Sequence, residues 1–431
     1  MSKRVLLVAF HFPPIKVSSG LERTLALTRH LPSHGWEPLV LTASPKAYPA
    51  VSAERMGSIP EGTVVKRCFA RDASRHLSIA GRYPAWLTLP DRWQSWAIGA
   101  IPSGLAMIRK YKPDLIWSTY PIASAHIIGC ALHRLSGVPW VADFRDPMVE
   151  YDARSDQWFP SWKALRNSRL WVEGLAARHA SALTFCTAGA RSIYSERYPN
   201  ADQRHWSIVS NGYDEAAFQA AAQRAPVQRH DDDLVLLHSG TIYPSPDRDP
   251  SYFLRAVRKV IDERPSGARR LRVIFRASSV ETLYAGLLEE LGLKDNVTFA
   301  PAIPYEAALA EMMQADGVLV FQGYTSNPAI PAKLYEYFRA ERPILAMADD
   351  EGDTARLIRE LGAGTVAPLD SVERIASSLN HYLAEIESGH WKPMPREQFS
   401  RYERAETVAQ FARLFDSLHS GQSAAYSERQ R

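Results

Sequence analysis

Short apolar runs alternate with longer amphipathic stretches along the whole chain. In the first half, the apolar runs predict strands at residues 4–10, 38–42, 64–68, 114–118, 140–144, 183–187 and 207–210. Several of these runs are apolar at every position, as strands covered by helices on two faces should be. This alternation of strand and helix patterns is typical of parallel βα units.

The alternation begins again after residue 233. Further strands are predicted at residues 234–239, 271–276, 297–300, 318–321, 344–347 and 365–366. Helical patterns separate them at residues 250–263, 280–291, 305–314, 331–340, 353–361 and 371–388. The restart predicts an α/β chain with two doubly wound, Rossmann-like domains.

The break between the domains is expected at residues 220–233, "AAAQRAPVQRHDDD", which are polar and show no clear period. Its acidic end is interpreted as solvated chain and not as a metal site. The predicted N-terminal domain is then residues 1–219, and the C-terminal domain is residues 234–398. An amphipathic segment at 399–419 is expected to cross back to the first domain, and residues 420–431 are expected to be disordered.

Composition narrows the range of partners. The 431 residues include 51 basic and 47 acidic side chains, so the net charge of +4 gives no polycation for nucleic acid. Cys68, Cys130 and Cys186 lack the spacing of a metal site and are expected to be buried thiols. The N-terminus is interpreted as a first strand and not as a signal peptide, and no apolar run is long enough to cross a bilayer. We therefore expect a cytoplasmic protein that can touch the inner membrane face.

Ligands of open α/β sheets bind beyond the carboxyl ends of strands. After the first strand, Ser18, Ser19 and Gly20 precede a helix that carries Arg23. Small residues there would let a phosphate or a sugar approach the backbone, although the same residues also make an ordinary helix cap. The sequence contains neither GxGxxG nor GxxxxGK[ST], which disfavours a standard dinucleotide or P-loop site.

The first strand of the second half is followed by a turn at Gly240 and Thr241, and Arg248 precedes the next helix. An arginine at this place can form a bidentate pair with a diphosphate, or instead a salt bridge to Asp247 or Asp249.

The stretch "NPAIPAKLYEYFRAERPIL" places Lys333 and Glu336 near the start of a short helix. A lysine at the positive end of a helix dipole is unfavourable unless an anion is present, so a phosphate is expected there. Glu336, one turn further, would accept hydrogen bonds from a pair of hydroxyls such as those of a ribose. An ordinary i, i+3 ion pair is the alternative.

These segments resemble the retaining GT-B glycosyltransferases of family 4 over roughly residues 4–418. The resemblance is carried by "FPPIKVSSGLERTLALTRHLPSHGWEPLVLT", "PDLIWSTYPIASAHIIG", "GVPWVADFRDP", "IVSNGYDEAAF", "LLHSGTIY" and "PAKLYEYFRAERPILA", in this order. It implies two facing Rossmann-like domains, a nucleotide-sugar donor held mainly by the second, an acceptor on the first and a C-terminal helix that crosses back.

The resemblance also implies roles for single residues. Glu336 corresponds to the second glutamate of the family's Glu-x7-Glu pattern, whereas Pro328 stands where the first should be. A subgroup with the "PAKLYEY" form also lacks that first glutamate. Arg248 and Lys333 resemble the pair that neutralises the leaving diphosphate. The expected donor-binding set is Gly20, Gly240, Thr241, Arg248, Lys333 and Glu336.

On the first domain, the resemblance implies an acceptor site. His126 is either a sugar contact or a buried helix histidine, and Asp146 would bond an acceptor hydroxyl or cap the next segment. The expected acceptor-binding set is Arg23, Arg145 and Asp146, and the expected catalytic set is Arg248, Lys333, His126 and Asp146.

Residues 71–98 mix basic and aromatic side chains, which suits either an anionic membrane surface or a plain cover over a domain edge. The residues concerned are Arg71, Arg75, Arg82, Arg92, Tyr83, Trp86, Trp93 and Trp96.

The expected function is metal-independent, retaining transfer of a sugar from a nucleotide-diphosphate sugar to a saccharide or lipid-linked acceptor, in cell-surface polysaccharide synthesis. No cofactor is expected beyond this co-substrate. The alternatives are a GT-B nucleotide-sugar epimerase and a non-catalytic scaffold that binds sugar nucleotides.

Overall fold

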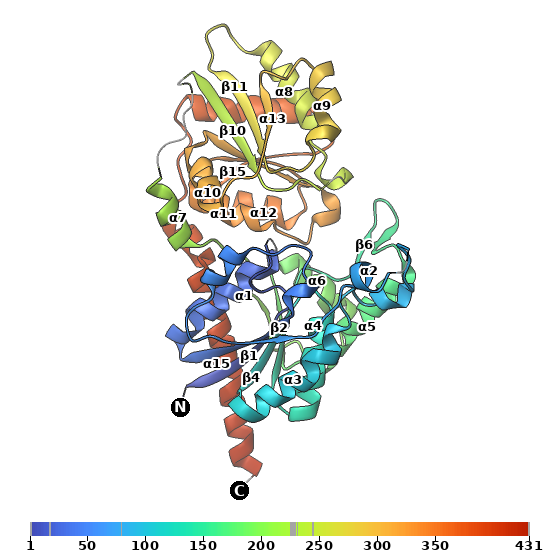
Figure 1. The fold of residues 1–431 in the computed structure, drawn as a ribbon. Coiled ribbons are helices and arrows are strands. Elements are labelled where there is room, and N and C mark those ends of the chain that lie inside the picture. The colour runs from blue at the N-terminus through green and yellow to red at the C-terminus, as the bar shows by residue number, and fades with distance from the viewer. Residues whose placement is uncertain are drawn as a thin grey trace. The chain divides into compact units, whose positions relative to one another are not determined.

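The computed structural model describes residues 2–16, 19–78, 80–224, 230, 232–243 and 245–429. The chain divides into two compact units, each built on one parallel sheet (Figure 1). Unit 1 comprises Met1–Ser210 and Arg404–Arg431, and unit 2 comprises Asn211–Glu403. The predicted α/β class with two Rossmann-like domains is confirmed.

The sheet of unit 1 has seven strands in the order β3-β2-β1-β4-β5-β8-β9. They are β1 Lys3–Val8, β2 Trp36–Ala43, β3 Val64–Cys68, β4 Leu115–Thr119, β5 Trp140–Arg145, β8 Ala182–Phe185 and β9 Trp206–Ile208. The order reverses at β1, so the carboxyl ends of β1 and β4 border the switch point at which ligands of such sheets bind.

Helices cover both faces of this sheet (Figure 1). They are α1 Ser19–His30, α2 Ala73–His76, α3 Trp96–Tyr111, α4 Ser124–Ser136, α5 Lys163–His179, α6 Ala188–Arg197 and α15 Arg404–Arg429. A short antiparallel pair, β6 Glu150–Asp152 and β7 Gln157–Phe159, was not predicted. Its sequence, "EYDARSDQWF", is too short and too polar to show a strand pattern.

The sheet of unit 2 has six strands in the order β12-β11-β10-β13-β14-β15. They are β10 Asp233–Ser239, β11 Arg270–Arg276, β12 Val297–Ala300, β13 Gly317–Gln322, β14 Ile344–Ala348 and β15 Gly364–Ala367. The main helices are α7 Glu215–Ala222, α8 Ser251–Glu263, α9 Glu281–Glu290, α10 Tyr305–Gln314, α11 Ala332–Ala340, α12 Asp353–Glu360, α13 Val372–Glu387 and α14 Arg396–Phe399.

Alternate residues of β13 enter two separate cores. Leu319 and Phe321 belong to the core that α8, α9 and α13 complete. Val318 and Val320 belong to the core on the other face, which α7, α10, α11 and α12 complete. The sheet is thus buried on both faces, which explains why its strands are apolar at consecutive positions.

The border between the units differs from the prediction. It lies between Ser210 and Asn211, ahead of the expected linker at residues 220–233. The reason is packing, because Tyr213, Phe218 and Ala221 are buried in a core of unit 2. Of the expected linker, residues 225–229 and 231 lie outside the described part of the chain.

The C-terminal segment returns to unit 1, as the family resemblance implied. Helix α15 packs against unit 1 through Val408, Phe411 and Phe415, and the Trp36 indole donates to Asp416 at 3.0 Å. It begins at Arg404, whereas the sequence predicted a start at 399, because α14 and a 3-10 turn precede it. The tail expected at 420–431 is helical to Arg429, and residues 430 and 431 lie outside the described residues.

The three cysteines are buried and free, as predicted. In the described part of the chain, no helix combines the length and the apolar character needed to span a membrane.

Candidate functional site

In unit 2, the carboxyl end of β10 and the first turn of α11 bring together several predicted donor residues. The Lys333 ammonium lies 2.9 Å from Nε2 of His238, the penultimate residue of β10. Gly240 follows directly, with φ of 107°, and a side-chain Cβ there would lie 3.2 Å from Lys333 Nζ. The left-handed backbone and the close ammonium both favour glycine. Thr241, the next residue, is exposed.

Arg248 lies near Lys333 in the same unit. It ends the 3-10 turn Pro246–Arg248, and its guanidinium lies over the Tyr243 ring, 5.2 Å from the centroid. Burial and then the charge of Arg248 lower the pKa of Lys333 to about 7, against the opposing effect of Glu336. Two cations thus gather beside a glycine turn, an arrangement that is unfavourable until an anion binds.

The carboxylates next to Arg248 have other partners. Asp247 accepts hydrogen bonds from the Thr325 amide at 2.9 Å and from the Ser326 hydroxyl. Asp249 accepts from the Ser251 amide at 2.9 Å and from the Tyr284 hydroxyl. Among the described residues, neither forms an ion pair with Arg248. The salt-bridge alternative for Arg248 is therefore not what the structure shows.

Two tyrosines fix helix α11. The Tyr337 hydroxyl accepts a hydrogen bond from the Ser239 amide at 2.9 Å, which holds the helix against the end of β10. The Tyr305 hydroxyl of α10 donates to Glu336 at 2.7 Å. The polar contact found for the Lys333 ammonium is with His238 and not with Glu336, so the two residues do not form the alternative i, i+3 ion pair.

His238 is a residue of this site that sequence reasoning missed. Its imidazole is buried, with Nδ1 3.0 Å from the carbonyl oxygen of Leu319. Burial and then the charge of Lys333 hold the pKa of His238 well below its usual range. The signal in the sequence was a single histidine at the end of the apolar run "LVLLH", directly before the glycine turn.

In unit 1, three strand ends meet the start of α1 at Gly20. A Cβ on Gly20 would lie 2.9 Å from His11 Nδ1, 3.1 Å from Arg145 Nη1 and 3.2 Å from Pro121 Cδ. His11 follows β1, Arg145 ends β5 and Pro121 follows β4. A larger side chain at position 20 would require these neighbours to shift. His11 was not predicted, and burial together with Arg145 lowers its pKa to about 4.

Arg145 ends β5 in an unusual conformation. It is 3% exposed and has φ of 64°, and the register between β5 and β8 shifts at this point. A buried non-glycine residue in the left-handed region is strained, and such strain clusters at functional sites. Asp146 follows, half-buried at the expected edge of the sheet, and its amide donates to the Phe144 carbonyl at 2.8 Å. Contacts of Arg145 and Asp146 with an acceptor remain predictions.

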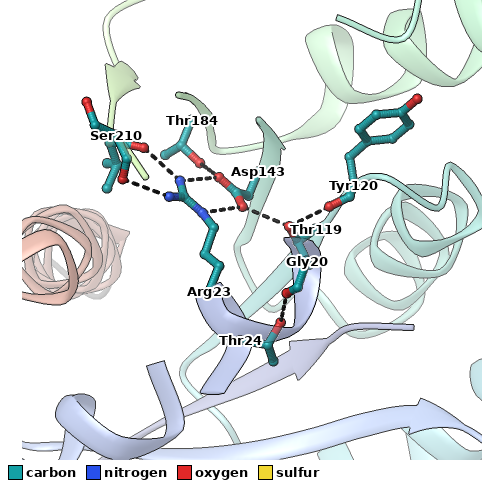
Figure 2. Close-up of polar contacts among 9 residues, drawn as sticks. Gly20, Arg23, Thr24, Thr119, Tyr120, Asp143, Thr184 and Ser210 are labelled. Carbon is teal, nitrogen blue, oxygen red and sulfur yellow. Dashed lines mark hydrogen bonds and ion pairs between the residues drawn. The ribbon is translucent and has the colours of Figure 1, made fainter. Parts of the chain in front are cut away.

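Arg23 points into unit 1 and not toward solvent. Its Nε and Nη2 donate to the two carboxylate oxygens of Asp143 at 2.9 and 2.8 Å (Figure 2). Its other contacts are with the carbonyl oxygens of Val209 and Ser210 at 2.8 and 3.0 Å. The guanidinium thus donates four hydrogen bonds to protein oxygens, and this arrangement does not support the acceptor contact expected for Arg23.

Asp143 is the centre of this network. It also accepts hydrogen bonds from the hydroxyls of Thr119 and Thr184, at 2.8 and 2.7 Å (Figure 2). The network therefore joins α1 to β4, β5 and β8 at their carboxyl ends. It therefore fixes the start of α1, which carries Gly20, relative to the end of β5, which carries Arg145.

His126 belongs to the core. It is 1% exposed in α4, and its Nδ1 lies 2.8 Å from the Ser118 hydroxyl, which accepts from the Trp140 indole at 2.7 Å. Its ring lies 4.6 Å from that of Phe144, and burial lowers its pKa to about 3. The structure favours the buried helix histidine over the catalytic role that the family resemblance suggested.

The aromatic stretch at residues 71–98 divides in two. Trp96 is buried, and the Trp93 indole donates to the Ala47 carbonyl at 3.2 Å. Both tryptophans therefore pack against the core of unit 1. Trp86 and Tyr83 are 65% and 38% exposed. Trp86 and Tyr83 are therefore available to a surface outside the protein, and Arg75 and Arg82 of the same stretch are exposed as well.

Among the described residues, no cluster of three or more His, Cys, Asp or Glu side chains has the placement of a metal site.

Comparisons with known proteins agree with the architecture. Residues 20–212 match the family model of the glycosyl transferase 4-like domain. No curated protein matches the sequence. Three similar structures are a sucrose-phosphate synthase from Thermosynechococcus elongatus, an α,α-trehalose 6-phosphate synthase from Burkholderia multivorans, and HepE from Anabaena in complex with UDP and glucose.

The structural likeness extends over both units. The sucrose-phosphate synthase is 16% identical, with a TM-score of 0.65 over 97% of this chain and 100% of the other. The trehalose 6-phosphate synthase is 14% identical, with a TM-score of 0.64 over 98% and 100%. HepE is 14% identical, with a TM-score of 0.55 over 99% and 100%. These likenesses confirm the GT-B fold predicted from the sequence.

Proposed function

With a glycosyl transferase 4-like domain at residues 20–212 and a GT-B fold over the whole chain as the premise, we propose that this protein transfers a sugar from a nucleotide-diphosphate sugar to a saccharide or lipid-linked saccharide. The observation that carries the proposal is the pair of cations Arg248 and Lys333 in unit 2, next to the glycine turn at Gly240.

This pair suits the leaving group of the reaction. The anomeric carbon becomes cationic as the diphosphate departs, and fixed cations at the leaving oxygens stabilise that charge separation. Arg248 would bind the diphosphate as a planar fork of donors, and Lys333 as a compact charge. Glu336, held by Tyr305, would accept hydrogen bonds from the ribose hydroxyls. HepE, which shares the fold, was crystallised with UDP and glucose.

Metal independence and retention of configuration are part of the proposal. The two side-chain cations supply the positive charge that a divalent ion supplies in other transferases. Retention follows from the family resemblance, with the acceptor attacking on the face of the leaving diphosphate and that phosphate taking the proton. Turnover that survives EDTA, and a product with the donor's anomeric configuration by NMR, are the expected results.

Unit 1 would hold the acceptor. Arg145 and Asp146 lie at the carboxyl end of β5, and the buried Arg23–Asp143 pair fixes this strand end relative to α1.

We further propose a cytoplasmic enzyme of cell-surface polysaccharide synthesis that meets lipid-linked acceptors at an anionic membrane. The exposed side chains of Trp86 and Tyr83 would contact that membrane. Cosedimentation with anionic vesicles, reduced in Trp86→Ser, tests this part.

The central experiment is a screen of UDP-, GDP- and dTDP-sugars for thermal stabilisation, because a bound donor raises the melting temperature by mass action. Release of nucleoside diphosphate from the stabilising donor is then measured with and without saccharide acceptors. Lys333→Ala is expected to abolish stabilisation and turnover, whereas Lys259→Ala, an exposed lysine on α8, should keep both.

The same measurements separate the alternatives. Acceptor-dependent release of nucleoside diphosphate supports a transferase, whereas conversion of the donor alone identifies an epimerase. Donor binding without turnover identifies a scaffold. If Lys333→Ala and Glu336→Ala both bind every donor as the wild type does, the proposed donor site is wrong.

A further inference from the structure

His238 is a buried polar side chain whose two ring nitrogens both have partners. It is 3% exposed, between the rings of Phe275 and Phe321 at centroid distances of 5.9 and 5.4 Å. Nδ1 lies 3.0 Å from the Leu319 carbonyl oxygen, and Nε2 lies 2.9 Å from the Lys333 ammonium. Burial of a polar ring costs free energy unless its polar atoms are bonded, so the two partners of His238 need an explanation.

The partners determine the form of the imidazole. A carbonyl oxygen can only accept a hydrogen bond, so Nδ1 carries the proton. An ammonium can only donate, so Nε2 presents its lone pair to Lys333. Protonation of Nε2 would place a second cation against the ammonium. His238 is therefore a neutral acceptor in this site.

A neutral acceptor has a particular consequence for Lys333. A carboxylate at this position would also orient the ammonium, but it would cancel the positive charge and compete with a bound anion. An imidazole lone pair fixes one N–H of the ammonium and leaves the charge and the other two N–H groups for a ligand. A Cβ at position 240 would lie 3.2 Å from Lys333 Nζ, so the lack of a side chain on Gly240 leaves room beside the ammonium.

We propose that His238 is a positioning residue, which accepts a hydrogen bond from Lys333 and holds its uncancelled charge for the diphosphate of the donor. The inference rests on the proposed function for the identity of the anion. The contact between His238 and Lys333 does not depend on it.

Substitutions can separate the two hydrogen bonds of His238. In His238→Asn, the amide keeps a donor near the place of Nδ1 for Leu319 but has no atom that reaches Lys333. In His238→Gln, the amide oxygen reaches the place of Nε2 and keeps the acceptor. Both variants replace the ring by an uncharged amide, and each keeps one of the two contacts: His238→Asn keeps the donor to Leu319, and His238→Gln keeps the acceptor for Lys333.

The first readout needs no ligand. In the full-length protein, the rate at which acetic anhydride modifies Lys333 is followed against pH by mass spectrometry. The charged groups facing this ammonium are Arg248 and Glu336, and both stay in place in the variants. The wild-type midpoint is expected near pH 7. His238→Asn should lower it by about one pH unit, because the charged form loses an acceptor, and His238→Gln should stay near the wild type.

The second readout is affinity for the stabilising sugar nucleotide at pH 7.5. His238→Asn is expected to weaken binding about tenfold, as for loss of one hydrogen bond to a charged group, and His238→Gln by much less. If Asn shifts neither the midpoint nor the affinity, the inference is wrong. If the midpoint shifts but Lys333→Ala binds every sugar nucleotide normally, the proposed donor site fails and the positioning contact stands.

A complementary variant covers the case in which His238→Asn does not fold. Lys333→Met removes the charge that faces His238, so the pKa of the imidazole should rise, which histidine NMR resonances report. An unchanged pKa in this variant would overturn the inference.

Discussion

The guanidinium of Arg23 and the carboxylate of Asp143 form a buried ion pair with two nearly parallel hydrogen bonds, of 2.9 and 2.8 Å (Figure 2). The pair joins α1 to β5 directly beneath the strand ends at which Gly20 and Arg145 meet. Its side chains are 7% and 0% exposed, so neither charge has water as an alternative partner. The pair therefore supports the geometry of unit 1 and does not itself present a binding group.

Asp143→Asn is expected to destabilise unit 1 by about 3–5 kcal/mol, because it leaves the Arg23 charge buried without a counter-ion. Denaturant unfolding and hydrogen exchange of β5 and α1 measure the loss. Asp202→Asn, which breaks the exposed pair of Asp202 with Arg204 in the same unit, is the control and should change little. Equal losses in the two variants would contradict a special role for the buried pair.

The same pair predicts a response to acid. Burial alone would raise the pKa of Asp143, but the charge and hydrogen bonds of Arg23 and the bond from Thr184 hold it below the usual value. A lowered folded-state pKa contributes stability that is present above the unfolded value of about 3.9 and is lost as pH falls through the folded value. Unfolding free energies between pH 5 and pH 2 should therefore fall more steeply in the wild type than in Asp143→Asn.

The sequence predicted the sheets well because parallel strands covered on both faces must be apolar at consecutive positions. Val318–Phe321 illustrates this, since its alternate residues enter two cores. The domain border was misplaced because the helix at 215–222 is short and its apolar residues, Phe218 among them, look the same whichever unit they pack against.

The candidate site was predictable in part. Lys333, Arg248 and Gly240 were predicted because helix starts and turns after strands are where anions bind in such folds, and the structure brings them together; their contact with a donor stays a prediction. The pairing of Arg23 with Asp143 could not be predicted, because this buried partner lies 120 residues away in the sequence. His126 and His238 show the same limit, since only the packing decides which of two histidines in apolar runs lies beside the Lys333 ammonium.

The pKa of Lys333 predicts how donor binding depends on pH. Burial and Arg248 place it at about 7 in the free protein, and a bound diphosphate would raise it, so binding takes up a proton above that pH. Affinity for a sugar nucleotide, whose diphosphate diester does not titrate in this range, should fall as pH rises from 6.5 to 8.5. Lys333→Arg keeps its charge throughout and should lose this dependence. Calorimetric titrations at several pH values measure both, and an unchanged slope in the arginine variant would contradict the assignment.

Glu336 is expected to act on the nucleoside and not on the diphosphate. Glu336→Gln should weaken binding of the preferred nucleoside diphosphate about tenfold more than binding of inorganic pyrophosphate, because only the former carries ribose hydroxyls, whereas loss of the charge near Lys333 acts on both ligands. Tyr305→Phe, which removes the hydroxyl that donates to Glu336 at 2.7 Å, should produce a smaller loss of the same kind. Competition assays with the two ligands provide the measurement. Equal weakening of both ligands would place Glu336 at the phosphates.

Gly240 combines a backbone constraint with a close approach to the Lys333 ammonium, and two alanine variants can separate these effects. At Gly240, φ is 107° and an added Cβ would lie 3.2 Å from Lys333 Nζ. At Gly267, φ is 90° and nothing lies within 4 Å of the added atom. Both substitutions force alanine into a backbone region that L-residues rarely adopt, at a cost of about 1–3 kcal/mol.

Of these two variants, only Gly240→Ala also places a methyl group in close contact with the Lys333 ammonium. We expect both variants to lower the free energy of unfolding, but only Gly240→Ala to weaken binding of the donor, because the added Cβ displaces the ammonium by a few tenths of an ångström from its place beside His238. Thermal melts report the loss of stability, and calorimetry at a temperature well below both melting points gives the affinity for the donor. Normal donor affinity in Gly240→Ala would show that the diphosphate does not use the ammonium in the position that His238 now holds.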